Sequence, residues 1–113
     1  MLISAPVSWG EMLDKITILQ IKTERMTDAS KLANVKKELD ELSATSEAAL
    51  RMPESAKIII DELKAVNEKL WVIEDDIREC ERQKDFGSSF IELARAVYFT
   101  NDERARLKRR LND

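Results

Sequence analysis

Pairs of carboxylates three residues apart are the first residues in this sequence whose type and spacing could do chemistry. Glu11 with Asp14, and Glu38 with Glu41, are such pairs. On a helix each pair lies on one face, and carboxylates from facing helices are ligands that Mg²⁺ takes in proteins. The acidic triplet Glu74–Asp76 cannot form such a site alone, because its side chains point in different directions around a helix. A solvent-exposed face is the simpler interpretation, so we predict no metal site and no catalytic residue.

A second polar group could form around Asp14 and Lys15. Both precede the run Ile16–Ile21, which is apolar nearly all round, so the first helix should be the most enclosed. Asn101 and Asp102 interrupt the apolar pattern near the end of the chain and could lie opposite these charges. Charged groups near a core usually pair or serve a site. We expect a structural ion pair or cap, with a small-ligand pocket as the alternative.

Five basic residues gather near the end of the sequence: Arg104, Arg106, Lys108, Arg109 and Arg110. Cations in the last turns of a helix interact favourably with its macrodipole, and this is an adequate explanation of the cluster. The alternative is a site for phosphate or an anionic sugar, with Arg104, Arg106 and Arg109 as ligands. Nucleic acid is not an expected partner, because no aromatic residues alternate with these cations.

The composition excludes several classes of site. The 113 residues contain no His, which removes imidazole bases, Ser-His and Cys-His nucleophile pairs and most zinc sites. The single cysteine, Cys80, excludes an internal disulfide and favours a reducing cytoplasm. No apolar run is long enough to span a membrane. We therefore expect a cytoplasmic protein without a cofactor.

The elements that must position these residues are helices, and one long stretch dominates them. Residues 54–84 contain no Gly or Pro, and their apolar residues recur four and three apart, as along the seam of a supercoiled helix: Ile59, Leu63, Val66, Leu70, Ile73, Ile77 and Cys80. This helix would be roughly 46 Å long, which exceeds the roughly 35 Å width of a compact domain of this size. Either the bundle is elongated or a second copy covers the surplus seam. Asn67 is either a buried polar residue that fixes register or part of a solvated flank.

Capping and breaking residues give the bounds of four helices, roughly 8–26, 28–51, 54–85 and 88–112. Ser8 and Glu11 have capping-box spacing, and Thr27 or Asp28 can begin the second helix. Gly87 suits the left-handed position after the third helix, and Ser88 or Ser89 can cap the fourth. The sequence leaves open whether the fourth helix is continuous at 99–103. We predict an all-α, elongated antiparallel four-helix bundle with coiled-coil-like seams, in a single domain over 1–113.

Three strings of this sequence resemble a known family: PVSWGEMLDKITILQIK at 6–22, KLANVKKELDEL at 31–42, and WVIEDDIRECERQKDFGSSFIELARAVYFTNDERARLKRRLN at 71–112. The family consists of small bacterial proteins and is described only as a domain of unknown function. The resemblance spans most of the chain but implies no activity. It suggests an accessory place in bacterial envelope-sugar metabolism.

These features favour a noncatalytic helical interaction or assembly module that forms a homodimer and can bind a further protein. The interface is expected on the long seam, at Leu63, Leu70, Trp71, Ile73 and Ile77, with Trp71 as anchor. Two alternatives stay open. One is a small all-helical enzyme that uses carboxylates and magnesium on a phosphorylated metabolite. The other is a regulatory subunit that binds an anionic ligand through the C-terminal basic cluster.

Overall fold

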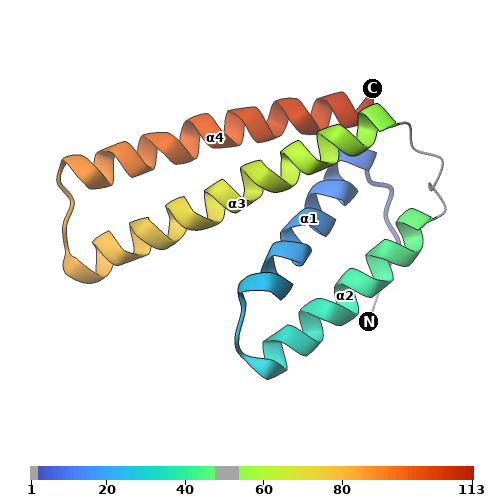
Figure 1. Ribbon diagram of the computed structural model, residues 1–113, viewed down its shortest axis with the longest axis horizontal. Coiled ribbons are helices and arrows are strands. Elements are labelled where there is room, and N and C mark those ends of the chain that lie inside the picture. The colour runs from blue at the N-terminus through green and yellow to red at the C-terminus, as the bar shows by residue number, and fades with distance from the viewer. Residues whose placement is uncertain (1–2, 48–53) are drawn as a thin grey trace.

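The computed structural model describes residues 3–47 and 54–113, which form four α-helices in two helical hairpins (Figure 1). The first hairpin joins α1 (Trp9–Arg25) to α2 (Ala29–Glu47), and the second joins α3 (Glu54–Gln83) to α4 (Ser88–Asn112). The molecule measures 48 × 34 × 24 Å. The predicted all-helical, elongated four-helix bundle is confirmed. No helix in the described part of the chain is long and apolar enough to cross a membrane.

The helix at the centre of the bundle is α1, although α3 is the longest. Helix α1 contacts α2, α3 and α4, whereas α2 contacts only α1 among the described residues. The inner side of α1 buries the apolar residues Leu13, Ile16, Leu19 and Ile21. This enclosure agrees with the expectation from the all-round apolar run of the first helix.

The apolar seam of α3 is covered inside the chain over most of its length. Ile59, Leu63 and Val66 form a buried cluster with Leu107 of α4. Burial along α3 continues to Ile73 and then stops, and none of residues 74–99 is buried. We call residues 74–99 the arm, because this part of the α3–α4 hairpin projects beyond α1 and α2 (Figure 1).

Two of the helix starts agree with the predicted caps. The Ser8 hydroxyl accepts a hydrogen bond from the Glu11 amide at 3.3 Å. The Asp28 carboxylate accepts from the amides of Ser30 and Lys31 at 3.0 and 3.1 Å. Helix α4 is continuous from Ser88 to Asn112, which answers the question left open at 99–103. The predicted end of the second helix near residue 51 lies outside the described residues.

The turn between α3 and α4 differs from the prediction. The left-handed residue is Lys84, with φ of 53°, whereas Gly87 has φ of −79° and occupies the N-cap of α4. The reason is that α3 ends at Gln83, two residues early, so the first position beyond the helix falls on Lys84. The Asp85 amide then closes the turn by donating to the Cys80 carbonyl at 2.9 Å. No serine side chain caps α4, so that part of the prediction was also wrong.

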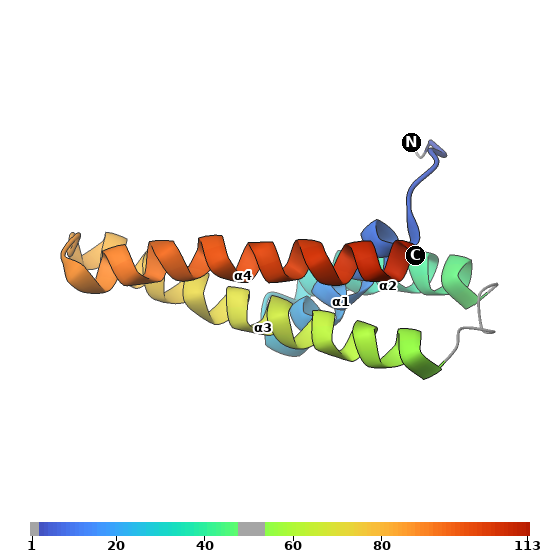
Figure 2. The same cartoon turned by 90° about the horizontal axis from the view of Figure 1, so that it is seen from above.

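Gly10 allows the start of α1 to touch the end of α4. A Cβ atom at this position would lie 2.4 Å from the Lys108 carbonyl oxygen, closer than side-chain carbons approach. The Gly10 amide also donates to Asn112 Oδ1 at 2.7 Å. Residues 3–7 precede this contact and lead away from the helices to one side (Figure 2).

Candidate functional site

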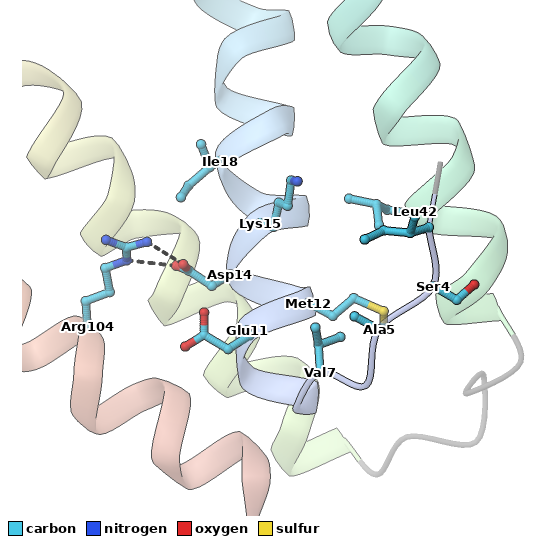
Figure 3. A pocket seen from close by; sticks show the side chains of 11 residues that line it. Ser4, Ala5, Val7, Glu11, Met12, Asp14, Lys15, Ile18, Leu42 and Arg104 are labelled. Atoms are coloured by element: carbon cyan, nitrogen blue, oxygen red, sulfur yellow. Dashed lines mark hydrogen bonds and ion pairs between the residues drawn. The ribbon is translucent and has the colours of Figure 1, made fainter. Parts of the chain in front are cut away.

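The most buried acid of the described residues is Asp14, which α1 places between α3 and α4. Its side chain is only 5% exposed. Arg104 of α4 donates to it through Nε, at 2.9 Å from Oδ1, and through Nη2, which bonds Oδ2 (Figure 3). Asn67 of α3 donates to Oδ1 at 2.9 Å. One carboxylate therefore joins three helices.

The neighbours of Asp14 complete a connected polar network. The Asn67 amide also donates to the Thr17 hydroxyl at 2.9 Å, and this hydroxyl donates to the Asp14 carbonyl at 2.7 Å. Lys108 Nζ lies 2.6 Å from a Glu11 oxygen and 3.9 Å from Asp14 Oδ2. Within the described part of the chain, no buried side-chain nitrogen or oxygen lacks a partner. Each buried polar side-chain atom of the network thus has a partner, as is usual for buried polar groups in folded proteins.

The electrostatics keep both members of the central pair charged. Burial alone would raise the pKa of Asp14, but hydrogen bonds from Arg104 and Asn67 and the charges of Arg104 and Lys108 outweigh it. The pKa of Asp14 is therefore lower than its ordinary value. Hydrogen bonding to Asp14 raises the pKa of Arg104. Asp14 stays ionised near neutral pH, so it cannot donate a proton there and is occupied as an acceptor.

An open cleft of about 700 Å³ lies beside this network, between residues 3–7, α1, α2 and α4 (Figure 3). Glu11, Asp14, Lys15 and Arg104 are the charged residues that line it. The Lys15 ammonium lies 2.8 Å from a Glu38 carboxylate oxygen of α2. The two cations that line the cleft are therefore each paired with a carboxylate.

The four residues of the predicted polar site separate into two places. Asp14 and Lys15 line the cleft, but Asn101 and Asp102 do not. Asn101 and Asp102 are exposed on α4, whose turns carry Arg104 inward. Of the polar residues in this part of α4, Arg104 therefore reaches the site, whereas Asn101 and Asp102 lie on the surface.

The predicted anion-binding residues also separate. Arg104 binds Asp14, whereas Arg106 and Arg109 are exposed and line a shallow hollow on α4 together with Asp102 and Glu103. The two remaining cations of the basic cluster form ion pairs, Lys108 with Glu11, and Arg110 with Glu62 at 3.7 Å. The basic cluster is therefore divided over different sides of α4.

The residues predicted for an interface are mostly interior. Leu63, Leu70 and Ile73 are buried under other helices of the same chain. Trp71 and Ile77 are half-buried, and Trp71 lines a small hollow near Arg104. The length of α3 predicted that part of its apolar seam would extend beyond the other helices. This uncovered part begins only after Ile73, because α1 and α4 cover the seam before it.

The paired carboxylates do not converge. In the described part of the chain no three acids lie close enough to hold a metal ion. Glu11, Asp14 and Glu38 each form an ion pair with a cation on another helix. These three ion pairs can hold the helices together, and they account for the positions of the acids without a metal ion.

The sequence analysis missed Thr17 as a member of the network and left the position of Asn67 open. Thr17 lies in an apolar run and gave no polar signal. Asn67 was assigned to either a buried polar position or a solvated flank, and the structure buries it. One feature of the sequence did indicate that Asn67 is buried. Asn67 directly follows the seam residue Val66, on a helix that must pack on two sides.

A protein-family model matches residues 3–113 of the chain. The chain belongs to DUF6165, a family of unknown function. No curated protein and no solved structure matches this DUF6165 chain. The function must therefore be argued from the geometry.

Proposed function

We propose that this DUF6165 protein is a noncatalytic helical assembly module that works as a homodimer in the bacterial cytoplasm. The single observation that carries the proposal is the arm. Its residues 74–99 include no buried side chain, whereas the other half of the same hairpin has a packed core. A pair of helices can bury only one side of each apolar seam, and stable domains add a further layer.

The arm exposes large apolar side chains to solvent. Phe86, Ile91, Tyr98 and Phe99 are all at least half exposed. Scattered exposed apolar residues are ordinary, but neighbouring ones on a projecting element are typical of interaction surfaces. Ile77 and Leu93 of the arm are half-buried and could gain burial from an added layer.

The polar network at the other end favours a structural role. Asp14, Arg104 and Asn67 bind one another, and the lowered pKa of Asp14 keeps it ionised. A general acid or base would need a pKa near the working pH. The network instead fixes the angle at which α1 holds the α3–α4 hairpin, so that the arm projects in one direction.

Neither alternative function has an observation of comparable weight. A magnesium enzyme would need Glu11, Asp14, Glu38 and Glu41 around one cavity, and the first three are each paired with a cation. An anion-binding subunit would need Arg104 beside Arg106 and Arg109, but Arg104 binds Asp14 on another side of α4. A place in envelope-sugar metabolism has the sequence resemblance as its only support.

Hydrogen exchange at several protein concentrations tests the assembly proposal. If the arm pairs with a second copy, amides in residues 74–99 exchange more slowly as concentration rises, because dimers shield and stabilise the arm. The exposed first-turn amides of Ser30 and Lys31 in α2, which exchange by local fraying away from the arm, serve as the internal control and keep the same rates. Arm exchange that does not depend on concentration would contradict a homodimer.

A further inference from the structure

The outer side of α4 carries a continuous exposed face along the arm and just beyond it. Its residues follow one another at spacings of three and four: Ile91, Arg95, Tyr98, Asp102 and Arg106, with Phe99 beside Tyr98. Ile91 is 56% exposed, Tyr98 68% and Phe99 58%. We call this set the aromatic face. Residues at such spacings lie along one side of a helix, so a partner helix could touch all of them together.

The centre of the aromatic face is already ordered in the single chain. The Tyr98 and Phe99 rings meet edge to face, with centroids 5.9 Å apart and planes at 82°. The Arg95 guanidinium lies over the Phe99 ring, 5.8 Å from its centroid. Aromatic residues and arginine are the types enriched at the centres of protein interfaces, and side chains held in place lose less entropy on binding.

The charges on either side of the aromatic pair have opposite signs. Arg95 lies three residues before Tyr98, and Asp102 lies three residues after Phe99. In an antiparallel pair of α4 helices with the two-fold axis between positions 98 and 99, Tyr98 faces Phe99 of the second copy. The same axis sets Arg95 against Asp102 of the second copy, twice by symmetry. The face is thus complementary to itself in this orientation.

We infer that the aromatic face is the dimer interface and that a second copy docks on it antiparallel, about a two-fold axis at Tyr98 and Phe99. A parallel arrangement would set Arg95 against Arg95 and Asp102 against Asp102, which like-charge repulsion disfavours. In the antiparallel arrangement Arg106 faces Ile91 of the second copy, and its aliphatic stem can cover that side chain. This inference rests on the proposed assembly function and specifies its surface.

A charge-exchange experiment tests this register by sedimentation of the full chain. Arg95→Asp and Asp102→Arg are each expected to weaken the dimer about tenfold, because each sets like charges against each other at two symmetric places. The double variant Arg95→Asp with Asp102→Arg restores opposite charges and should regain most of the lost affinity. All these side chains are exposed, so circular dichroism should report unchanged helicity.

Arg82→Asp is the matched control, because Arg82 is an exposed arginine of the same arm that lies on α3 and pairs with Glu79. It should leave the dimer unchanged. A dimer that tolerates both single exchanges, or one that the double variant fails to restore, overturns the proposed register but leaves the assembly function standing. A wild-type chain that stays monomeric at all concentrations overturns both.

Discussion

Replacing Asp14 by Asn removes the central charge of the network and keeps its size. The Asn amide oxygen can still accept from Arg104 Nε, but the amide NH2 replaces the oxygen that accepts from Nη2, so that hydrogen bond is lost. Arg104 and Lys108 are also left with one carboxylate fewer. A hydrogen bond to a charged group contributes about 1.5–3 kcal/mol, and one buried partner left alone costs more. Because the Arg104 side chain is 27% exposed, water screens part of the loss. We expect a decrease of about 2–3 kcal/mol in the free energy of unfolding.

The assay is urea unfolding followed by circular dichroism near neutral pH, with Glu38→Gln as the control. Glu38 also pairs with a cation across helices, but its side chain is 45% exposed and that of Lys15 is 58% exposed. The control should therefore lose at most about 0.5 kcal/mol. Equal losses in the two variants, or an Asp14→Asn variant as stable as wild type, would refute the structural role of the network.

The pH dependence gives a second readout of the same pair. The pKa of Asp14 in the folded protein lies below the ordinary value of 3.8 that the unfolded chain has. Folding therefore stabilises the ionised form of Asp14. The contribution of this ionised form to the free energy of unfolding is fully present above the unfolded pKa, and it is lost as pH falls through the folded pKa. The stability difference between wild type and Asp14→Asn should therefore be constant near neutral pH and shrink below pH 3.8. A difference that persists through strong acidification would contradict this account.

Two further substitutions have defined outcomes. Gly10→Ala should destabilise the fold by about 1–3 kcal/mol in urea unfolding, because the new Cβ meets the Lys108 carbonyl; Gly87→Ala, which meets only Asp85 Oδ1 at 3.3 Å, should cost less. Equal costs would contradict the close approach of α1 and α4. Asn67→Asp replaces a donor to Asp14 by a second carboxylate, so it should cost at least about 1 kcal/mol near neutral pH and less in acid. A loss that is independent of pH would argue against direct contact with Asp14.

Local sequence signals were sufficient for the elements of the fold. Ser8 and Asp28 cap helices as their types predict, and the apolar periodicity of α3 gives its length to within a few residues. The error at Gly87 shows the limit of such signals, because a shift of two residues in the end of α3 moves the left-handed position to Lys84.

The site depended on contacts that no local pattern contains. Asp14 and Arg104 are 90 residues apart in sequence, and the macrodipole explained Arg104 equally well. Periodicity showed that α3 has a seam but could not show that α1 and α4 cover it up to Ile73. The exposed side of α4 was overlooked for the same reason, since the exposure of Tyr98 and Phe99 depends on how the other helices pack.

The most direct test of the central claim is the mass of the wild-type chain, measured by light scattering after size exclusion at several concentrations. Assembly through the arm predicts a mass that approaches about 26 kDa, twice the chain mass of 13.0 kDa, as concentration rises. A mass that stays at 13.0 kDa throughout, with helicity intact, would contradict the account.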